Sequence, residues 1–123
     1  MPFRNHESKT AHLTSGKNAE DTAHQFLQEQ GLRPIGRNFR CKLGELDLLM
    51  RDGRALVIVE VRYRKTSRYG TAAETVTAAK QSRIIAATHY FLSRSPQYKD
   101  CPIRFDVVAL SGGGAINWIK NAF

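Results

Sequence analysis

The alternation of apolar and polar residues in the first half of the chain predicts a β-hairpin. Residues 44–50 (GELDLLM) and 55–63 (ALVIVEVRY) are dominated by Leu, Ile and Val, and a weaker strand pattern covers 34–40. Asp52-Gly53 separates the two strong runs, and Asp-Gly is a preferred pair for a two-residue type I′ turn. We therefore expect an antiparallel hairpin in which Arg51 pairs with Arg54, which places Glu60 opposite Glu45.

Two helical patterns flank these strands. Apolar residues recur at helical spacing from residue 15 or 16 to Gly31, and again over 77–93. The residues expected on the inward faces are Ala19, Ala23, Phe26, Leu27 and Gln30 in the first helix, and Ala79, Ile84, Ala87 and Phe91 in the second. Strand patterns follow at 103–110 and 115–119. The order α-β-β-β-α-β-β predicts an α/β domain with a mixed central sheet flanked by two helices.

The hairpin also predicts which side chains share a face, because side chains alternate along a strand. One face carries only apolar residues and is expected in the core: Leu46, Leu48, Met50, Val57, Val59 and Val61. The other face carries Leu49, Leu56 and Ile58 near the turn, and Glu45, Asp47, Glu60 and Arg62 toward the far end. Crowded carboxylates are unfavourable unless something compensates their charge. A bound Mg²⁺ would do so, and so would ion pairs with Arg62, Arg64 and Lys42; the residues alone leave both readings open.

The charge of the chain favours a polyanionic partner. The net charge is +8, and the stretch 33–68 holds ten basic residues against four acids: Arg33, Arg37, Arg40, Lys42, Arg51, Arg54, Arg62, Arg64, Lys65 and Arg68, against Glu45, Asp47, Asp52 and Glu60. Such an excess is typical of proteins that bind nucleic acid, although a solvated basic surface is the alternative. Within this stretch, residues 64–75 are expected to form a basic loop.

Length and local composition set the domain organisation. A chain of 123 residues is the size of one domain. Residues 1–14 are polar and unpatterned, so we expect a flexible N-terminal tail before a single domain at 15–123. Cys41 and Cys101 lack metal-ligand spacing and are expected to be free, partly buried thiols. No signal-peptide segment and no membrane span is evident, so a cytoplasmic location is expected.

An ordered series of motifs resembles a known nuclease fold. The run at 44–49 (GELDLL) followed by 57–62 (VIVEVR) resembles the GEID…VEVK core of the PD-(D/E)XK, restriction-endonuclease-like fold. The chain looks most like the small bacterial YraN family, which is similar to archaeal Holliday-junction resolvases. The resemblance covers nearly the whole chain after the tail, and it includes residues 16–20, Arg37-Asn38, Tyr69-Gly70, 76–80 and 104–108.

The resemblance implies roles for residues at matching positions. Asp47, Glu60 and the Val61 carbonyl would hold Mg²⁺ or Mn²⁺, with Glu45 as an auxiliary acid. Glu20 matches an acid that joins such sites from the first helix, although alone it would be taken for a surface acid. Lys80 could contact a phosphate, or it could be a solvated charge on the helix, and the sequence leaves both roles open. The other basic residues expected to contact nucleic acid are Arg37, Arg40, Arg64, Lys65 and Arg68.

The sequence departs from the nuclease pattern at Arg62, where the motif has lysine. Arginine stays protonated, so it can clamp a phosphate but is a poor general base. The expected function is a metal-dependent, nuclease-like protein that acts on structured DNA, with Arg62 as a catalytic group. The first alternative is a nucleic-acid-binding module that does not cleave its ligand. The second, less favoured alternative is a protein-interaction domain. Resolvase-like members of the fold act as dimers, so a homodimer is an open alternative. The sequence shows no distinct apolar stripe that would form a dimer interface.

Overall fold

The computed structural model describes residues 16–64 and 76–123. They form α2 (Gly16–Glu29), β1 (Arg33–Cys41), β2 (Gly44–Asp52), β3 (Ala55–Arg64), α3 (Ala78–Ser93), the short 3-10 helix η2 (Pro96–Tyr98), β4 (Ile103–Ser111) and β5 (Ile116–Ile119). The predicted order α-β-β-β-α-β-β is therefore confirmed. The expected N-terminal tail at 1–14 and nearly all of the expected basic loop at 64–75 lie outside the described residues. Within the described part of the chain, no helix is long and apolar enough to cross a membrane.

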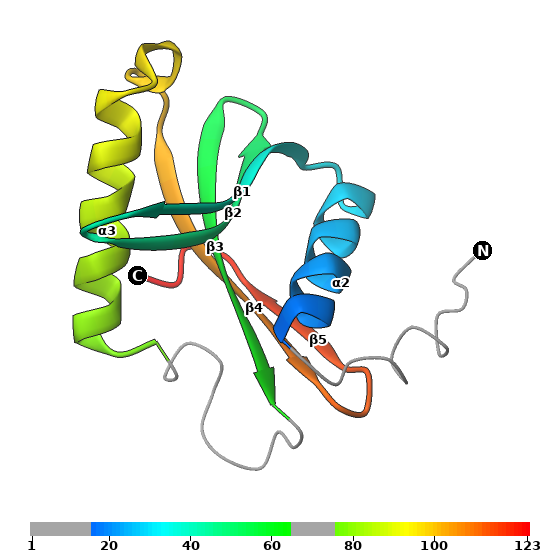
Figure 1. Cartoon of the computed structure of the whole chain (residues 1–123). Helices are drawn as coiled ribbons and strands as arrows, with labels where there is room; N and C mark the ends of the chain where they lie inside the picture. The colour runs from blue at the N-terminus through cyan, green and yellow to red at the C-terminus, as the bar shows by residue number, and fades with distance from the viewer. Residues whose placement is uncertain (1–15, 65–75) are drawn as a thin grey trace.

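The five strands form one mixed sheet between two helices. The strand order is β1-β2-β3-β4-β5, and only the β3–β4 pair is parallel. A parallel pair needs a crossover connection, and α3 supplies it. The two helices lie on opposite sides of the sheet (Figure 1). Each side therefore has its own apolar cluster, one beneath α2 and one beneath α3.

Most of the inward positions predicted for the helices are confirmed. In α2, Ala19, Ala23 and Leu27 are fully buried against the sheet, and Phe26 packs at the edge of their cluster. Gln30 is exposed, contrary to the prediction, because α2 ends at Glu29 before this position is reached. The α2 side of the sheet carries most of the apolar face predicted for the hairpin, with Leu48, Met50, Val57 and Val59 in the α2 cluster.

In α3 the pattern fails only at the first turn. Ile84 and Ala87 are buried as predicted and Phe91 packs against their cluster, whereas Ala79 is exposed. Val76, just before the helix, fills the core position at this end instead. Thr88 is buried too. Its hydroxyl donates to the Ile84 carbonyl at 2.8 Å, so the buried hydroxyl has its hydrogen-bond partner within the helix.

The predicted hairpin register is wrong by two residues. Asp52 pairs with Ala55, so the turn consists of Gly53 and Arg54 rather than Asp52 and Gly53. Gly53 has a φ of 60°, whereas Arg54 does not have a positive φ. This matches the type II′ turn, which favours glycine at its first central position. An even shift keeps every side chain on its predicted face, but it places Asp47, and not Glu45, opposite Glu60.

Beyond Leu48 the β1–β2 hairpin separates from β3. The β2–β3 pairing ends at Leu48 and Val59, whereas β1 and β2 stay paired as far as Cys41 and Gly44. The hairpin then reaches across toward α3 (Figure 1). Leu46 is consequently buried, as predicted, but in the α3 cluster rather than with Leu48 and Met50 of its predicted face. The predicted grouping is wrong because strict alternation assumes a strand that stays flat within the sheet.

The tip of the β1–β2 hairpin packs closely against α3 at Gly44. A Cβ at this position would lie 2.8 Å from the Arg83 carbonyl oxygen. We expect Gly44→Ala to lower the free energy of unfolding by about 1–3 kcal/mol, because backbone must move to make room. Gly36→Ala in β1 is the matched control, since a Cβ there would meet nothing within 4 Å and its φ is not positive. Urea unfolding of both variants measures the difference, and equal stabilities would mean that the contact is not tight.

Candidate metal and phosphate site

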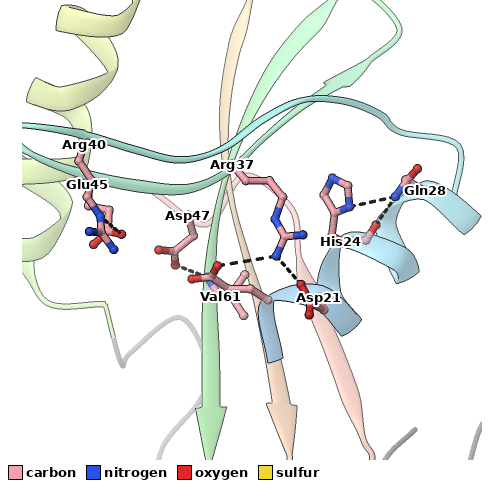
Figure 2. Close-up of polar contacts among 9 residues, drawn as sticks. Asp21, His24, Gln28, Arg37, Arg40, Glu45, Asp47 and Val61 are labelled. Carbon is pink, nitrogen blue, oxygen red and sulfur yellow. Dashed lines mark hydrogen bonds and ion pairs between the residues drawn. The ribbon is translucent and has the colours of Figure 1, made fainter. Parts of the chain in front are cut away.

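Asp47 and Glu60 come together where β2 and β3 stop pairing. Continuing the register of the two strands places these residues opposite each other. Glu60 is only 4% exposed. The Val61 N–H donates to Asp47 Oδ2 at 2.9 Å, which ties the Asp47 carboxyl to β3 (Figure 2). The two carboxyl groups also share a hydrogen bond when one of them is protonated.

Two cations lie against Glu60. Lys80 Nζ is 3.4 Å from Glu60 Oε2, and Arg62 Nε is 3.7 Å from the same oxygen. Lys80 belongs to the first turn of α3, where its N–H donates to the side chain of the N-cap residue Thr77 at 3.2 Å. Because α3 begins beside the acid pair, Lys80 contacts Glu60 instead of being a fully solvated helix charge.

Burial raises the pKa of the acids in this cluster. The pKa of Glu60 is raised to about 7, mainly by burial and next by the neighbouring Asp47 charge, against the opposing effect of Lys80 and Arg62. The pKa of Asp47 is also raised, mainly by burial, although its bond from the Val61 N–H acts in the other direction. Near neutral pH the pair therefore holds a proton for part of the time, as expected of two carboxylates that repel each other in a poorly solvated site.

Glu20 reaches the cluster from α2. Its pKa is raised by burial and then by the charge of Asp47. Arg37 of β1 binds Asp21 at 2.7 Å (Figure 2) and lies 3.9 Å from Glu20. The structure thus brings the acid of the first helix close to the pair on β2 and β3.

Asn38 is a member of the cluster to which the sequence gave no role. Its side chain hydrogen-bonds to Glu20. Its φ of 54° lies in the left-handed region, which asparagine tolerates better than most residues. An asparagine within a strand pattern, directly after Arg37, was the sequence feature that could have indicated its place in the cluster.

A basic hollow opens beside the acid pair, between the hairpin tip and α3. Its volume is about 450 Å³, and it is lined by Arg40, Cys41, Gly44, Glu45, Lys80, Arg83 and Ile84. Arg40 Nε binds Glu45 Oε2 at 3.0 Å (Figure 2), and the charge of Glu45 adds to the causes that raise the pKa of Asp47. Arg83 had no predicted role; its spacing of three residues from Lys80 on a helix was the signal that could have found it.

Of the remaining predicted residues that the structure describes, Arg64 lies outside this cluster. Arg64 ends β3, and its carbonyl accepts a bond from the Gly112 N–H at 2.9 Å. It is four residues beyond Glu60, about 13 Å along the strand. Lys65 and Arg68 are not among the described residues. Cys41 and Cys101 are free and half-buried, as predicted.

Comparison with known proteins places this arrangement in a family. Residues 19–110, which hold every described residue of the acid cluster, match the family described as "Uncharacterised protein family UPF0102". The chain belongs to the UPF0102 family. This is the YraN-like family that the motifs indicated.

Individual UPF0102 proteins are similar over nearly their whole length. One from Pseudomonas fluorescens is 48% identical over 114 residues, which cover 92% of this chain and 95% of the relative. One from Saccharophagus degradans is 49% identical over 112 residues, covering 91% and 94%. One from Herminiimonas arsenicoxydans is 50% identical over 114 residues, covering 93% and 90%.

The donor set of the UPF0102 site suits a hydrated divalent ion better than a dehydrated one. Among residues 16–64 and 76–123, no three Asp, Glu, His or Cys side chains are grouped to enclose a metal by themselves. Asp47 and Glu60 provide two carboxylates in contact, with the Val61 backbone beside them. Mg²⁺ keeps several waters and is often bound through one or two carboxylates. The pair therefore fits Mg²⁺ or Mn²⁺ and does not fit a metal that requires a closed protein shell.

The raised pKa of Glu60 predicts a pH dependence of stability. Glu60 changes from an ordinary value of 4.5 to about 7 in the folded UPF0102 chain, so between these values the folded state holds a proton that the unfolded chain has lost. Stability should therefore fall as pH rises from about 4.5 to above 7. Glu60→Gln should unfold like the wild type at pH 5 and be more stable at pH 8, by up to about 3 kcal/mol.

Denaturant unfolding at the two pH values tests this expectation. Glu45→Gln is the matched control, because Glu45 is exposed and its ion pair with Arg40 contributes at most about 1 kcal/mol. A Glu60→Gln variant less stable than the wild type at pH 8 would show instead that the ion pairs with Lys80 and Arg62 outweigh the cost of burying the charge.

Proposed function

We propose that this UPF0102 chain binds nucleic acid through a restriction-endonuclease-like fold and cleaves structured DNA with Mg²⁺ or Mn²⁺ held at Asp47 and Glu60. The observation that carries the proposal is the contact between these two acids beside Lys80, at the point where β2 leaves β3. The mixed sheet between two helices is consistent with that fold.

The acid pair supports the metal part of the proposal. Two adjacent, poorly solvated carboxylates repel each other, and a divalent cation between them would remove that repulsion. When bound, the ion would supply a nucleophile by lowering the pKa of a coordinated water. The Val61 N–H holds Asp47 in position for this role, and Glu20 adds negative charge from α2.

The cations around the pair support the nucleic-acid part. Lys80 and Arg62 lie within 4 Å of Glu60, so a phosphate near the acid pair would be within reach of both side chains. Arg62 would stabilise the charge that develops on the reacting phosphate, because a guanidinium donates several hydrogen bonds and stays protonated. The hollow lined by Arg40, Lys80 and Arg83 would accept the neighbouring backbone.

A second candidate function is a nucleic-acid-binding module that does not cut. It is favoured by one observation: Lys80 and Arg62 already compensate part of the charge of Glu60, so the acid pair is tolerated without a metal. Arg62 in place of the motif lysine also withholds a general base. The two candidates share the binding surface and differ in turnover.

A cleavage assay with an Asp47→Asn variant separates them. We expect the wild type to cut branched or flapped DNA with Mn²⁺, and Asp47→Asn to lose at least about a hundredfold in rate while binding DNA as tightly or more tightly, because it removes a negative charge from a site that meets phosphates. Glu29→Gln removes an exposed acid at the end of α2 and serves as the matched control. Binding without metal-dependent cleavage of any DNA structure would favour the module, and cleavage that survives Asp47→Asn would exclude the proposed site.

A further inference from the structure

Two arginines face each other at the end of the β1–β2 pairing that is remote from the hairpin tip. Arg33 and Arg51 are direct partners in the register of the two strands. Arg51 Nε donates to the Gly53 carbonyl at 3.1 Å. In the described segments, no carboxylate forms an ion pair with either guanidinium. Like charges directly opposite each other weaken strand pairing, so the juxtaposition of Arg33 and Arg51 lowers the stability of the sheet.

The pair lies at a hollow of about 480 Å³ lined by Gly31, Arg33, Arg51 and Gly53. Both glycines have positive φ, 98° and 60°, as required where the chain turns into β1 and out of β2. A Cβ at either glycine would meet nothing within 4 Å, so the space above the two turns is open to a ligand. Arg54, exposed in the same turn, adds a third cation. The chemistry of this hollow is that of an anion-binding site.

We propose that Arg33 and Arg51 bind a phosphate of the nucleic-acid backbone, as a second contact separate from the acid pair. The inference rests on the proposed function for its ligand. Guanidinium groups bind phosphate in bidentate geometry and lose less hydration free energy than an ammonium group does. A phosphate held between the two arginines would also remove their repulsion.

The position of the hollow favours a polymer over a small free anion. Along β2 the acid pair lies between the two basic hollows, with Gly44 and Glu45 lining one and Arg51 and Gly53 lining the other. Arg51 is four residues from Asp47, about 13 Å along the strand. A duplex rises about 3.4 Å per base pair, so this separation corresponds to about four base pairs.

The test compares Arg33→Gln/Arg51→Gln with the charge-matched control Arg94→Gln/Lys99→Gln at the exposed end of α3 and η2. Affinity for a 20-base-pair duplex is measured from low to physiological salt. Each lost phosphate contact lowers the slope of log K against log salt by about 0.9. We expect the first variant to lose about 1 unit of slope and about tenfold in affinity at 0.1 M salt, and the control to stay within about threefold.

Further measurements decide the outcome. Arg33→Gln/Arg51→Gln should melt at the wild-type temperature or above it at low salt, and Arg33→Lys/Arg51→Lys should recover most of the slope. If the glutamine variant keeps the wild-type affinity and slope, the inference about Arg33 and Arg51 is wrong, and the proposal for the acid pair is not affected. Stabilisation of the wild type, but not of the variant, by inorganic phosphate or an acidic peptide, with equal duplex affinity, would overturn the nucleic-acid assignment. A slope that falls as expected in a protein that never cleaves would support this contact and remove only the proposed cleavage.

Discussion

Arg62→Lys is expected to increase metal-dependent cleavage of structured DNA by a factor on the order of 10²–10⁴, the usual contribution of one general base. Arg62 Nε lies 3.7 Å from Glu60 Oε2, and its side chain is 29% exposed. A lysine at this position would keep the positive charge beside the acid pair. Its pKa can fall in a partly buried site, so that it could accept a proton from an attacking water, whereas arginine stays protonated. Initial rates with Mn²⁺ on branched and flapped substrates measure the gain.

The same substitution at the end of β3 provides the control. Arg64→Lys changes an arginine two residues along the strand and should leave the rate within about twofold, since position 64 is about 13 Å from Glu60. Arg62→Ala should weaken DNA binding, because it removes a cation from the site. If the wild type already cuts efficiently and Arg62→Lys slows it, Arg62 is an adapted catalytic group and the lysine is not required.

Asp106→Ala is expected to have the largest effect on stability, a loss of about 3–5 kcal/mol in the free energy of unfolding. Asp106 is fully buried. Its carboxylate accepts bonds from Arg104 Nε and Nη2 at 2.9 and 3.0 Å, from Trp118 Nε1 at 2.9 Å and from the Asn121 N–H at 2.9 Å. Alanine would leave all these donors without their acceptor in a site that water reaches poorly. In a domain of this size the melting temperature should fall by roughly 10 °C or more.

Asp52→Asn is the matched control, because it removes the other carboxylate that binds Arg104. Asp52 lies 3.0 Å from Arg104 and its side chain is 37% exposed. Solvent screens such a pair, so the substitution should cost at most about 1 kcal/mol. Similar losses in the two variants would mean that Arg104, rather than the buried carboxylate, holds β4 and β5 together.

The sequence by itself determined the elements and the faces of the sheet. Side chains alternate along a strand, and an even change of register leaves that alternation unchanged. Asp47, Glu60 and Arg62 were therefore placed on one face correctly, even though the predicted pairing was wrong by two residues. Helical spacing likewise identified Ala23 and Ala87 as buried, because a helix on a sheet buries one stripe of its surface.

The local pattern could not show where each element meets its neighbours. Gln30 and Ala79 fit the helical spacing, yet one follows the end of α2 and the other lies in the exposed first turn of α3. Leu46 fits the strand alternation, yet the hairpin leaves β3 before this residue and turns it toward α3. Such positions depend on contacts between segments that are distant in the sequence.

The chemistry of the site was decided by tertiary structure. The turn at Gly53 sets which carboxyl faces Glu60, since a glycine with positive φ at the first central position shifts the pairing. The crossover through α3 brings Lys80 to within 3.4 Å of Glu60 across 20 residues of chain. Burial and the neighbouring Asp47 charge then raise the pKa of Glu60 to about 7. A sequence names the ionisable groups, but only the packed structure sets the solvent exclusion and the neighbouring charges on which their pKa values depend.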